Sequence, residues 1–478
     1  MAMQNRCSKG ILIGIFLMAS ISARAQVNVT TWHNDLSRTG VNPQETILTT
    51  ANVNTNEFGK LFSIPVDGQV YAQPLVLSGV NIGGGTHDVL YIATEHDSVY
   101  ALDADSGTIY AKVSLIPAGG TTVNSSSDLA CGDLEPEVGI TGTPVIDPAS
   151  NTLYVVAKSK VNGSIVQHLH ALNTLTLAEN FGSPVQIQGS VPGAAKDGDG
   201  TRVTFNPIWE NQRPGLVLEN GHVLIAWAAH CDNPPYHGWM MSYNASTLAQ
   251  EAVWNAAPNG NPNNNDTPAA GIWMSGAAPA VDVNGNIFVA TGNGFWNGTT
   301  DFANSVVKLG PPANGTFPIL DYFTPAFQAP GDTDLGSGGI ALLPTTSSGK
   351  QLLVQQGKEG RIVLLDRTNL GKNCLKQSPP CTTGNSQIPQ ELVNATAGVW
   401  NSPMYWNGRI YWNAANDFAF SWSFDAGNSG LISTSPTSHS AQTYAETAAA
   451  SVSANNLTMA FTGSWPTPVS SWHTMPPI

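Results

Sequence analysis

Hydrophobic residues fall along this chain in short runs, alternating or fully apolar, that are separated by Asp-Gly, Asn-Gly and Gly-Gly turns. Runs of about four to eight such residues between turn signals are typical of β-strands. No stretch has the periodicity of an amphipathic helix. The pattern therefore predicts an all-β protein.

One phrase recurs six times: a strand, a polar or glycine-rich turn, and a second strand that ends in a small residue, an aliphatic residue and an Asp-like position. The clearest copy is YIATEHDSVYALDADSG, which begins at Tyr91. The spacings between the closing positions are 70, 71, 65, 57 and 59 residues. The closing positions are Asp103, Asn173, Asn244, Leu309, Asp366 and Asp425.

A β-hairpin repeated at this period predicts a β-propeller, because one twisted four-stranded sheet cannot bury both of its faces alone. We expect seven or eight four-stranded antiparallel blades in a single domain over residues 26–457. The sequence WHN at 32–34, with Arg38 after it, predicts an ordered N-terminal arm that lies across a face of the ring.

Both ends of the chain depart from the repeat. Arg6 and Lys9 precede a short apolar run and a small-residue cleavage pattern, so residues 1–25 are predicted to be a signal peptide for export to the periplasm or the outside. After residue 457 the strand pattern is lost, and residues 458–478 are predicted to be irregular. Back-translation with a shift of two nucleotides restores a propeller hairpin there. We therefore hypothesise that the tail is out of frame and that the last blade is incomplete.

Without the predicted signal peptide, 16 Lys and Arg face 33 Asp and Glu, a formal net charge of −17. An acidic surface repels phosphate backbones, so nucleic acid is not an expected partner. No later segment reaches the roughly 18 apolar residues of a membrane-spanning helix. We expect a monomer with no transmembrane segment.

Four cysteines follow the predicted signal peptide, and an even count in an exported chain indicates disulfides. Cys374 and Cys381 share one polar loop, NCLKQSPPC, and are predicted to pair. Cys131 and Cys231 are then the two cysteines that remain, and only the even count indicates that they pair. The alternative is that they are two separate buried thiols.

Several phrases resemble those of a known superfamily. SVYALDADSG, GIWMSGAAPAVDVNGNIFVATGNG and GKEGRIVLLDR are similar to segments of the pyrroloquinoline-quinone (PQQ) repeat β-propellers, the superfamily of the quinoprotein alcohol dehydrogenases. The resemblance covers nearly all of residues 58–456 and implies up to eight four-stranded blades.

The resemblance also implies a cofactor site. Trp273 precedes the phrase TGNGFWN and resembles the Trp that stacks on the quinone. Asn293 resembles the Asn that ligates calcium, and Trp296 is a further candidate for binding the cofactor. The cofactors implied are PQQ and calcium, and a propeller that binds neither is the alternative.

Catalytic roles follow from the same resemblance. Asp332 or Asp334 resembles the carboxylate that takes the alcohol proton, with Asp334 also a candidate metal ligand, and Lys358 resembles the cation near the quinone carbonyl. Calcium takes about six to eight oxygen ligands, some of which the quinone supplies.

Two departures weaken this assignment. The dehydrogenases carry a Glu ligand in the blade that we match to the segment from Tyr154, whose turn offers only the run Lys158–Lys160. Glu135 or Glu137, from a neighbouring turn, is the alternative ligand. Cys131 is followed by Gly132, so the adjacent-cysteine pair of the dehydrogenases is absent.

Each candidate residue also has an ordinary structural explanation. The tryptophans can pack between blades, Asn293 can hold a left-handed turn, the two aspartates can cap turns, and Lys358 can be a solvated hairpin tip. The phrase from His230 to Trp239 is the densest polar grouping in the chain, and His230 and His237 have no common metal-ligand spacing.

Three functions remain open. The first is an exported propeller that binds a small-molecule ligand or an exported protein partner, without catalysis. The second is a calcium- and PQQ-dependent dehydrogenase of alcohols or sugars. The third is a hydrolase or lyase that uses His230 and His237. The missing Glu favours the first, and the retained order of Trp273, Asn293, Asp334 and Lys358 favours the second.

Overall fold

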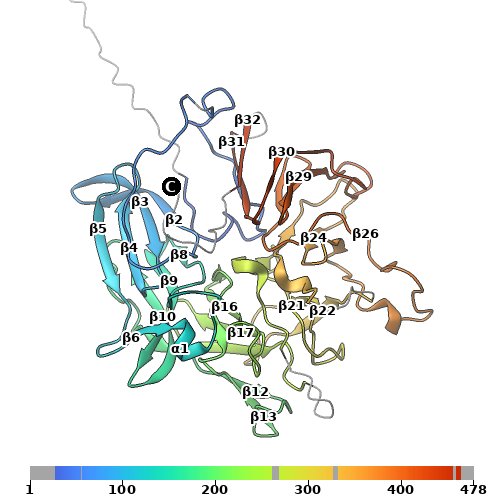
Figure 1. Ribbon diagram of the computed structural model, residues 1–478, viewed down its shortest axis with the longest axis horizontal. Coiled ribbons are helices and arrows are strands. Elements are labelled where there is room, and N and C mark those ends of the chain that lie inside the picture. Colours follow the sequence, from blue (N-terminus) through green and yellow to red (C-terminus); the bar gives the residue numbers. More distant parts are fainter. Residues whose placement is uncertain (1–26, 55, 261–268, 327–331, 456–458, 465–478) are drawn as a thin grey trace, which may run out of the picture.

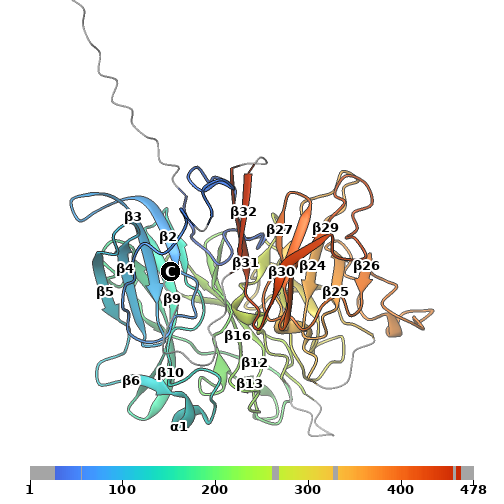
Figure 2. The same ribbon diagram turned by 45° about the horizontal axis from the view of Figure 1, so that its top comes forward.

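A computed structural model describes residues 27–54, 56–260, 269–326, 332–455 and 459–464. Over these residues the regular secondary structure is almost entirely β-strand, and seven sheets stand radially around a central axis, with an eighth that is a two-stranded hairpin (Figure 1). Turning the molecule shows the sheets side by side around the ring (Figure 2). The prediction of an all-β propeller of four-stranded blades is confirmed.

The first three sheets follow in chain order. The first contains β2 (Leu75–Ile82), β3 (Gly85–Ala93), β4 (Ser98–Asp103) and β5 (Ile109–Ser114). The second contains β8 (Val145–Asp147), β9 (Thr152–Val161), β10 (Ser164–Asn173) and β11 (Val185–Gln186), extended by β6 (Thr121–Asn124) and β7 (Glu137–Val138). The third contains β15 (Val217–Glu219), β16 (His222–Ala229), β17 (Trp239–Asn244) and β18 (Gln250–Asn255), with β14 (Glu210–Asn211) paired to β16.

The next three sheets are regular four-stranded units. The fourth contains β19 (Ala280–Val281), β20 (Ile287–Ala290), β21 (Val306–Leu309) and β22 (Ile319–Phe323). The fifth contains β23 (Ile340–Leu342), β24 (Leu352–Gln356), β25 (Ile362–Asp366) and β26 (Gln390–Leu392). The sixth contains β27 (Met404–Trp406), β28 (Arg409–Asn413), β29 (Asp417–Ser423) and β30 (Ser438–Tyr444). A separate hairpin joins β12 (Ser190–Pro192) to β13 (Arg202–Thr204). The helices are short: α1 (Ser125–Leu129), η1 (Met274–Gly276), η2 (Leu335–Ser337) and η3 (Cys374–Lys376).

The seventh sheet joins the two ends of the described chain. β1 (Val41–Asn42) pairs in parallel with β31 (Ala450–Asn455), which pairs antiparallel with β32 (Met459–Ser464). This sheet has three strands, as expected for an incomplete last blade. The irregular tail predicted from residue 458 is corrected here, because β32 continues the ladder from β31. Residues 465–478 lie outside the described part, and the frame hypothesis stays a prediction.

The core lies between neighbouring sheets. Trp227 and Trp239 are fully buried in the third sheet, where Phe205 meets both rings edge-on at 5.2 and 5.9 Å between centroids. Trp412 and Trp422, from β28 and β29, meet edge-on at 5.3 Å. Large aromatic side chains fill the wedge between radial sheets, where each buries most of its surface.

The predicted N-terminal arm is present and crosses the ring. Its backbone bonds to inner strands of six of the seven sheets: Val29 with Val76, Thr30 with Ile146, Leu36 with Val281, Ser37 with Leu342, Thr39 with Tyr405 and Gly40 with Val452. Arg38 is completely buried and donates to the carbonyl oxygens of Pro279, Trp32 and Asp35 and to the Thr31 hydroxyl, at 2.8–2.9 Å. The arm therefore ties the sheets together at the axis.

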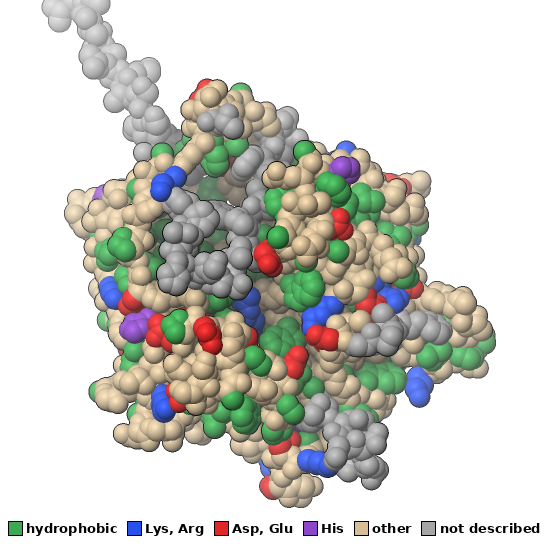
Figure 3. Space-filling model, viewed as in Figure 1, with side chains coloured by type: hydrophobic (Ala, Val, Ile, Leu, Met, Phe, Trp, Pro, Cys, Tyr) green, Lys and Arg blue, Asp and Glu red, His purple; other side chains and the backbone are tan. Residues whose placement is uncertain are grey.

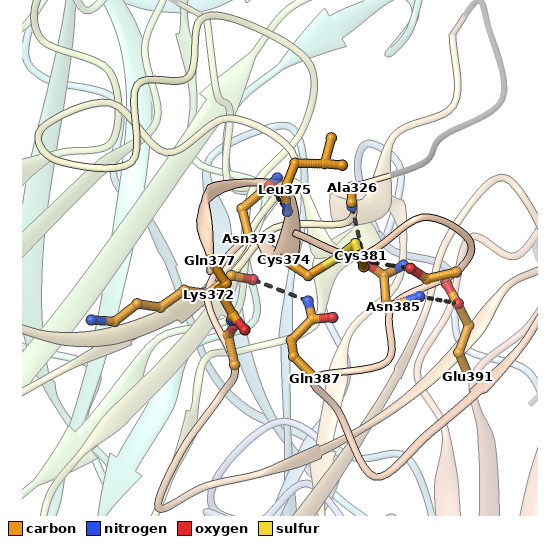
Figure 4. Close-up of a disulfide and its surroundings, with 12 residues drawn as sticks. Ala326, Lys372, Asn373, Cys374, Leu375, Gln377, Cys381, Asn385, Gln387 and Glu391 are labelled. Atoms are coloured by element: carbon orange, nitrogen blue, oxygen red, sulfur yellow. Dashed lines mark hydrogen bonds between the residues drawn. A yellow bond between two sulfur atoms is a disulfide. The ribbon is translucent and has the colours of Figure 1, made fainter. Parts of the chain in front are cut away.

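Both predicted disulfides are present, and the alternative of two separate thiols is wrong. Cys131 is bonded to Cys231, and Cys374 to Cys381. The second bridge lies in a loop braced by hydrogen bonds from Asn385 to Glu391 (Figure 4). The predicted signal peptide lies outside the described residues. Among the described residues, no helix has the length and apolar character needed to cross a membrane.

Candidate functional site

Four of the candidate residues meet where two neighbouring sheets end. Asn293 follows β20 in the fourth sheet, and Lys358 follows β24 in the fifth. Asp332 and Asp334 precede η2, which leads into β23. We call Asn293, Asp332, Asp334 and Lys358 the acid–lysine cluster.

Lys358 is the centre of this cluster. Its Nζ donates to both carboxylate oxygens of Asp332, at 2.7 and 2.8 Å, and to Oδ2 of Asp334, at 2.8 Å. The Asn293 backbone N–H donates to Oδ1 of Asp334 at 2.5 Å, and its side-chain amide donates to Asp332 at 2.9 Å. The sequence prediction that these residues belong together is therefore matched by direct contacts.

The two carboxylates differ in their exposure. The Asp332 side chain is 65% exposed, whereas that of Asp334 is 4% exposed. Burial raises the pKa of Asp334, although Lys358 opposes the shift. A hydrogen bond from Lys358 lowers the pKa of Asp332. Asp334 is therefore the better proton acceptor, and Asp332 is a solvated counter-ion.

Trp273 lies beside the cluster. A Cβ at Gly292 would stand 2.9 Å from Oδ1 of Asp334 and 3.0 Å from Cδ1 of Trp273, so the bare glycine lets the indole and the carboxylate approach. Trp273 is half-buried and packs against the small apolar cluster of Tyr236, Ala229 and Ala269. An indole ring is therefore available beside the charged groups.

Trp296 is not brought to the cluster by any described contact. Its ring lies 6.5 Å from that of Tyr322, on β22, the last strand of the fourth sheet, and Lys376 Nζ lies 5.9 Å from its centroid. Trp296 therefore packs against Tyr322, and its predicted part in cofactor binding stays a prediction.

The structure changes the account of the missing carboxylate. Lys158 is on β9 in the second sheet, and the third sheet stands between it and Asn293 (Figure 1). Its Nζ donates to the carbonyl oxygens of Ile208 and Glu210 and to Nε2 of His230. A side chain able to bind the same ligand as Asn293 would come from the third sheet, in which the sequence comparison identified no ligand-binding residue.

The third sheet does offer carboxylates. The hydroxyl of Tyr236 donates to Asp232 at 2.7 Å, and both Asp334 and Glu210 contribute to raising the pKa of Tyr236, after burial and Asp232. Glu210 is buried, and its Oε2 has no partner among the described residues. Asp232 lies in the polar phrase from His230; no sequence signal marked Glu210.

The remaining candidates have partners elsewhere. Glu135 accepts from Ser126, and Glu137 accepts from Thr122 and contacts His96, so both stay near β6 and β7. His237 Nε2 lies 3.0 Å from Asp197 and its Nδ1 lies 3.1 Å from the Ala257 carbonyl. His230 instead contacts Lys158, so the two histidines do not share a site.

Calcium does not fit the acid–lysine cluster as its side chains lie. Both aspartates are bound by the Lys358 ammonium, and Oδ1 of Asn293 accepts from Asn304 at 3.1 Å. A divalent cation needs about six oxygen ligands and would have to displace this fixed positive charge. A planar anionic quinone fits these side chains better than calcium does, because an indole ring and a cation are both present.

Figure 3 shows the face seen in Figure 1, with a hollow near the centre of the ring and Lys or Arg side chains at its base. Acidic side chains stand beside the basic ones around this hollow. The face therefore presents mixed charge at the axis rather than one sign.

Comparison with known proteins bears on the fold. No protein-family model and no curated protein matches the chain. Among solved structures, the quinohemoprotein alcohol dehydrogenase of Comamonas testosteroni aligns with a TM-score of 0.54 and 15% identity, over 92% of this chain and 68% of that one. A quinohemoprotein alcohol dehydrogenase of Pseudomonas putida HK5 gives 0.52 and 16%, over 86% and 61%.

A europium-containing methanol dehydrogenase gives a TM-score of 0.58 and 12% identity, over 90% of this chain and 81% of that one. The chain is thus shorter than all three of these proteins, and at such identities the likeness shows the fold alone. The repeated phrases, the radial sheets and these neighbours agree. The chain has the β-propeller fold of these alcohol and methanol dehydrogenases.

Proposed function

We propose that this protein is an exported β-propeller that binds a small-molecule ligand at the acid–lysine cluster and Trp273. The observation that carries the proposal is the contact of Lys358 with Asp332 and Asp334 beside a half-buried indole. Such a site combines an aromatic face with a few fixed polar groups, as ligand sites commonly do. A planar ligand with polar edges matches it.

The donor set supports binding without a metal. Lys358 already neutralises the charge of the buried Asp334, so the cluster is complete without an added cation. A ligand carbonyl or carboxylate can accept from the Lys358 ammonium, and a ligand hydroxyl can donate to Asp332, which is largely exposed.

A quinone-dependent dehydrogenase of alcohols or sugars is the second candidate. The observation that favours it is the close approach of Trp273, Asn293, Asp334 and Lys358, the four residues that the sequence resemblance assigns to such a site. The pKa of Asp334 is raised by burial, which suits a proton acceptor.

Calorimetric titration of the mature protein with PQQ, with and without calcium, separates the two functions. A frame-corrected version of the chain is titrated alongside. Binding that calcium does not change supports a metal-independent ligand site. Tight one-to-one binding that requires calcium supports the dehydrogenase, and no binding by either version removes PQQ as the ligand.

A matched pair of lysine variants shows where the ligand binds. Lys358→Met removes the ammonium from the cluster and should abolish binding. Lys350→Met removes an exposed lysine whose Nζ contacts only the Ser429 carbonyl among the described residues, and should leave binding unchanged. Equal affinities of the two variants would place the ligand elsewhere.

Export and a monomeric state are also part of the proposal. Export is supported by the charged and apolar pattern of residues 1–25 and by the two disulfides, which form in oxidising compartments. N-terminal sequencing of the protein from the periplasm or medium, with its mass in solution, tests both.

A further inference from the structure

The disulfide between Cys131 and Cys231 lies beside two other side chains that commonly bind metals, Asp133 and His230. Cys131 and Asp133 come from the loop after α1, and His230 and Cys231 come directly after β16. The Sγ atom of Cys131, a carboxylate oxygen of Asp133 and a ring nitrogen of His230 all lie within 4.8 Å of one another. We call Cys131, Asp133, His230 and Cys231 the disulfide cluster.

Asp133 faces both of its neighbours in this cluster. Its Oδ1 lies 2.7 Å from Sγ of Cys131 and 3.7 Å from Nδ1 of His230. A disulfide sulfur carries no hydrogen, so the shorter contact is not a hydrogen bond while the bridge is closed. The carboxylate therefore lies where a single cation can contact the sulfur, the oxygen and the nitrogen together.

His230 presents an unpartnered ring nitrogen to the cluster. Its side chain is completely buried, and Nδ1 has no hydrogen-bond partner among the described residues. The other ring nitrogen, Nε2, lies 2.9 Å from Lys158 Nζ. Burial lowers the pKa of His230 to about 4, so the ring is neutral, the form that binds metals. A buried polar atom without a partner is costly, and a bound ion would satisfy this one.

Opening the disulfide would complete a set of four ligands. Thiolates, and not disulfide sulfurs, bind metals, so the reduced cluster offers two sulfurs, one carboxylate oxygen and one imidazole nitrogen. Zinc prefers four such ligands in a tetrahedron, in which the ligand atoms lie about 3.3–3.8 Å apart. The present spread of up to 4.8 Å closes with small movements. Cys231 is exposed, so the cluster is open to solvent on that side.

We propose that the disulfide cluster is a redox-gated zinc site, in which the reduced protein holds one Zn²⁺ through Cys131, Cys231, Asp133 and His230. A dithiol opens the site: it gives two electrons and two protons to the bridge and becomes a disulfide, and the bridge becomes two thiols. Zinc then displaces three protons, one from each thiol and one from the hydrogen-bonded pair of His230 and Lys158.

The hydrogen bond to Lys158 agrees with this proton balance. A metal on Nδ1 leaves the ring proton on Nε2, which then donates to Lys158 as a neutral amine. Burial lowers the pKa of Lys158 to about 7, so the amine form is accessible near neutral pH. The disulfide cluster shares no residue with the acid–lysine cluster, and the proposal does not depend on the proposed function.

Zinc in the reduced protein would replace the cross-link that reduction removes. The disulfide joins residues 100 positions apart, and a metal ion held by the same two loops closes the same length of chain. The link between the loop after α1 and the turn after β16 is therefore kept in both redox states, by a covalent bond in one and by zinc in the other.

Zinc uptake by the reduced protein tests the proposal. The mature protein is reduced with a phosphine, which becomes the phosphine oxide, and is titrated with zinc in competition with a chromophoric chelator. We expect one zinc ion per reduced chain and none per oxidised chain. Serine at both Cys131 and Cys231 should abolish the binding. Serine at both Cys374 and Cys381 is the matched control, because it removes the other pair, and should leave the binding unchanged.

Single variants test the two ligands that are not cysteines. Asp133→Asn and His230→Asn should each weaken zinc binding by at least about tenfold, because each removes one of four ligands. His439→Asn, which removes an exposed histidine, should leave it unchanged. Asp133 is partly exposed, so its variant keeps the test decisive if the His230 variant does not fold.

Urea unfolding gives an independent measurement. Zinc should raise the unfolding midpoint of the reduced protein and leave that of the oxidised protein unchanged. The same result is expected if the reduced chain is unfolded without zinc, because metal binding then drives folding. Absence of zinc uptake by the reduced protein, equal uptake by the oxidised protein, equal zinc affinities of the two double serine variants, or an unchanged affinity of Asp133→Asn would each overturn the proposal.

Discussion

Lys358 compensates a buried charge, and this role decides what its loss would cost. Its ammonium serves Asp334, which is almost fully buried, and Asp332, which is largely exposed. An exposed ion pair contributes little to stability, whereas an unpaired buried carboxylate is costly. The contribution of the cluster to stability therefore comes mainly from the ion pair of Lys358 with Asp334.

Removing the ammonium should destabilise the fold more than removing the exposed carboxylate. Lys358→Met should lower the free energy of unfolding by about 3 kcal/mol, because it leaves Asp334 uncompensated. Asp332→Asn should cost less than about 1 kcal/mol. Urea unfolding at pH 7 measures both, and the double variant of Lys358→Met with Asp334→Asn should recover part of the loss. Equal losses for the two single variants would show that Asp334 does not depend on Lys358.

Activity provides a second test at residue scale. If the dehydrogenase candidate is correct, Asp334→Asn should abolish dye reduction with alcohols or sugars, because the amide cannot take the proton. Asp332→Asn is the control and should retain most of the activity. Unchanged dye reduction by the Asp334 variant would remove that residue from the mechanism.

Glu95 should make stability depend on pH in a defined window. Its pKa is about 4.5 in the unfolded chain and about 7 in the fold, because burial disfavours the charged form. Between these values the native state binds more protons than the unfolded chain, so stability falls as pH rises and then levels off. Glu95→Gln should remove this fall, which amounts to about 3 kcal/mol. Exposed Glu57→Gln is the control, and an unaltered profile for Glu95→Gln would contradict the assignment.

Sequence reasoning succeeded where a residue acts on its own neighbours in the chain. The Asp-like closing positions end the third strand of their sheets, because their side chains accept hydrogen bonds from backbone N–H groups two or three residues later in the chain. Asp103 accepts from the N–H groups of Asp105 and Ser106. Asn173 accepts from those of Leu175 and Thr176. Leu309 has no such side chain, yet it also ends a strand. Glu210 was missed because no motif in its own segment marks it and only the pairing of β14 with β16 sets its position.

At the scale of elements, the ends of second strands converge on one face. Glu95 follows β3, His230 follows β16, Asn293 follows β20 and Lys358 follows β24, so equivalent turns of different sheets supply the polar residues. The sequence marked the last two through a resemblance in motif. The third sheet was recognised as a repeat through Asn244, but no cofactor ligand was assigned to its turn, which contains Cys231 and the following prolines.

The disulfide from Cys131 to Cys231 should stabilise the fold more than the one from Cys374 to Cys381. The first spans 100 residues and the second spans 7, and loop-closure entropy grows with the loop. Replacement of both cysteines by serine should cost about 4–5 kcal/mol for the long loop and about 2 kcal/mol for the short one. Urea unfolding of the two double variants measures the difference; a larger loss for the short loop would contradict this account.

At the scale of the molecule, the ring is held by an arm as well as by its closing sheet. Carbonyl oxygens of residues 29–40 accept backbone hydrogen bonds from the inner strands of six sheets, and Trp32 packs close to Gly215 at the start of the remaining one. The arm bonds the middle or last residues of several of these strands, whereas the acid–lysine cluster precedes their first residues. Arm and site therefore lie at different levels along the axis.

Arg38 should be the residue through which the arm stabilises the whole ring. It is completely buried, and its guanidinium satisfies carbonyl oxygens of the arm and of Pro279, just before β19. Arg38→Met fills similar space but leaves these oxygens without donors in the interior, at about 1–3 kcal/mol each. The variant should therefore lose several kcal/mol of unfolding free energy, and Arg202→Met, on the exposed hairpin, should lose almost none.

The cooperativity of unfolding tests the role of the arm more directly than the free energy of unfolding does. With the arm released, each sheet keeps its own ladder but loses its link to the axis, so tryptophan fluorescence and far-ultraviolet circular dichroism should no longer report one urea transition. The wild type should show coincident transitions, because Trp227, Trp239, Trp412 and Trp422 are buried on both sides of the ring. Coincident, unshifted transitions in Arg38→Met would mean that the sheets hold the ring without the arm.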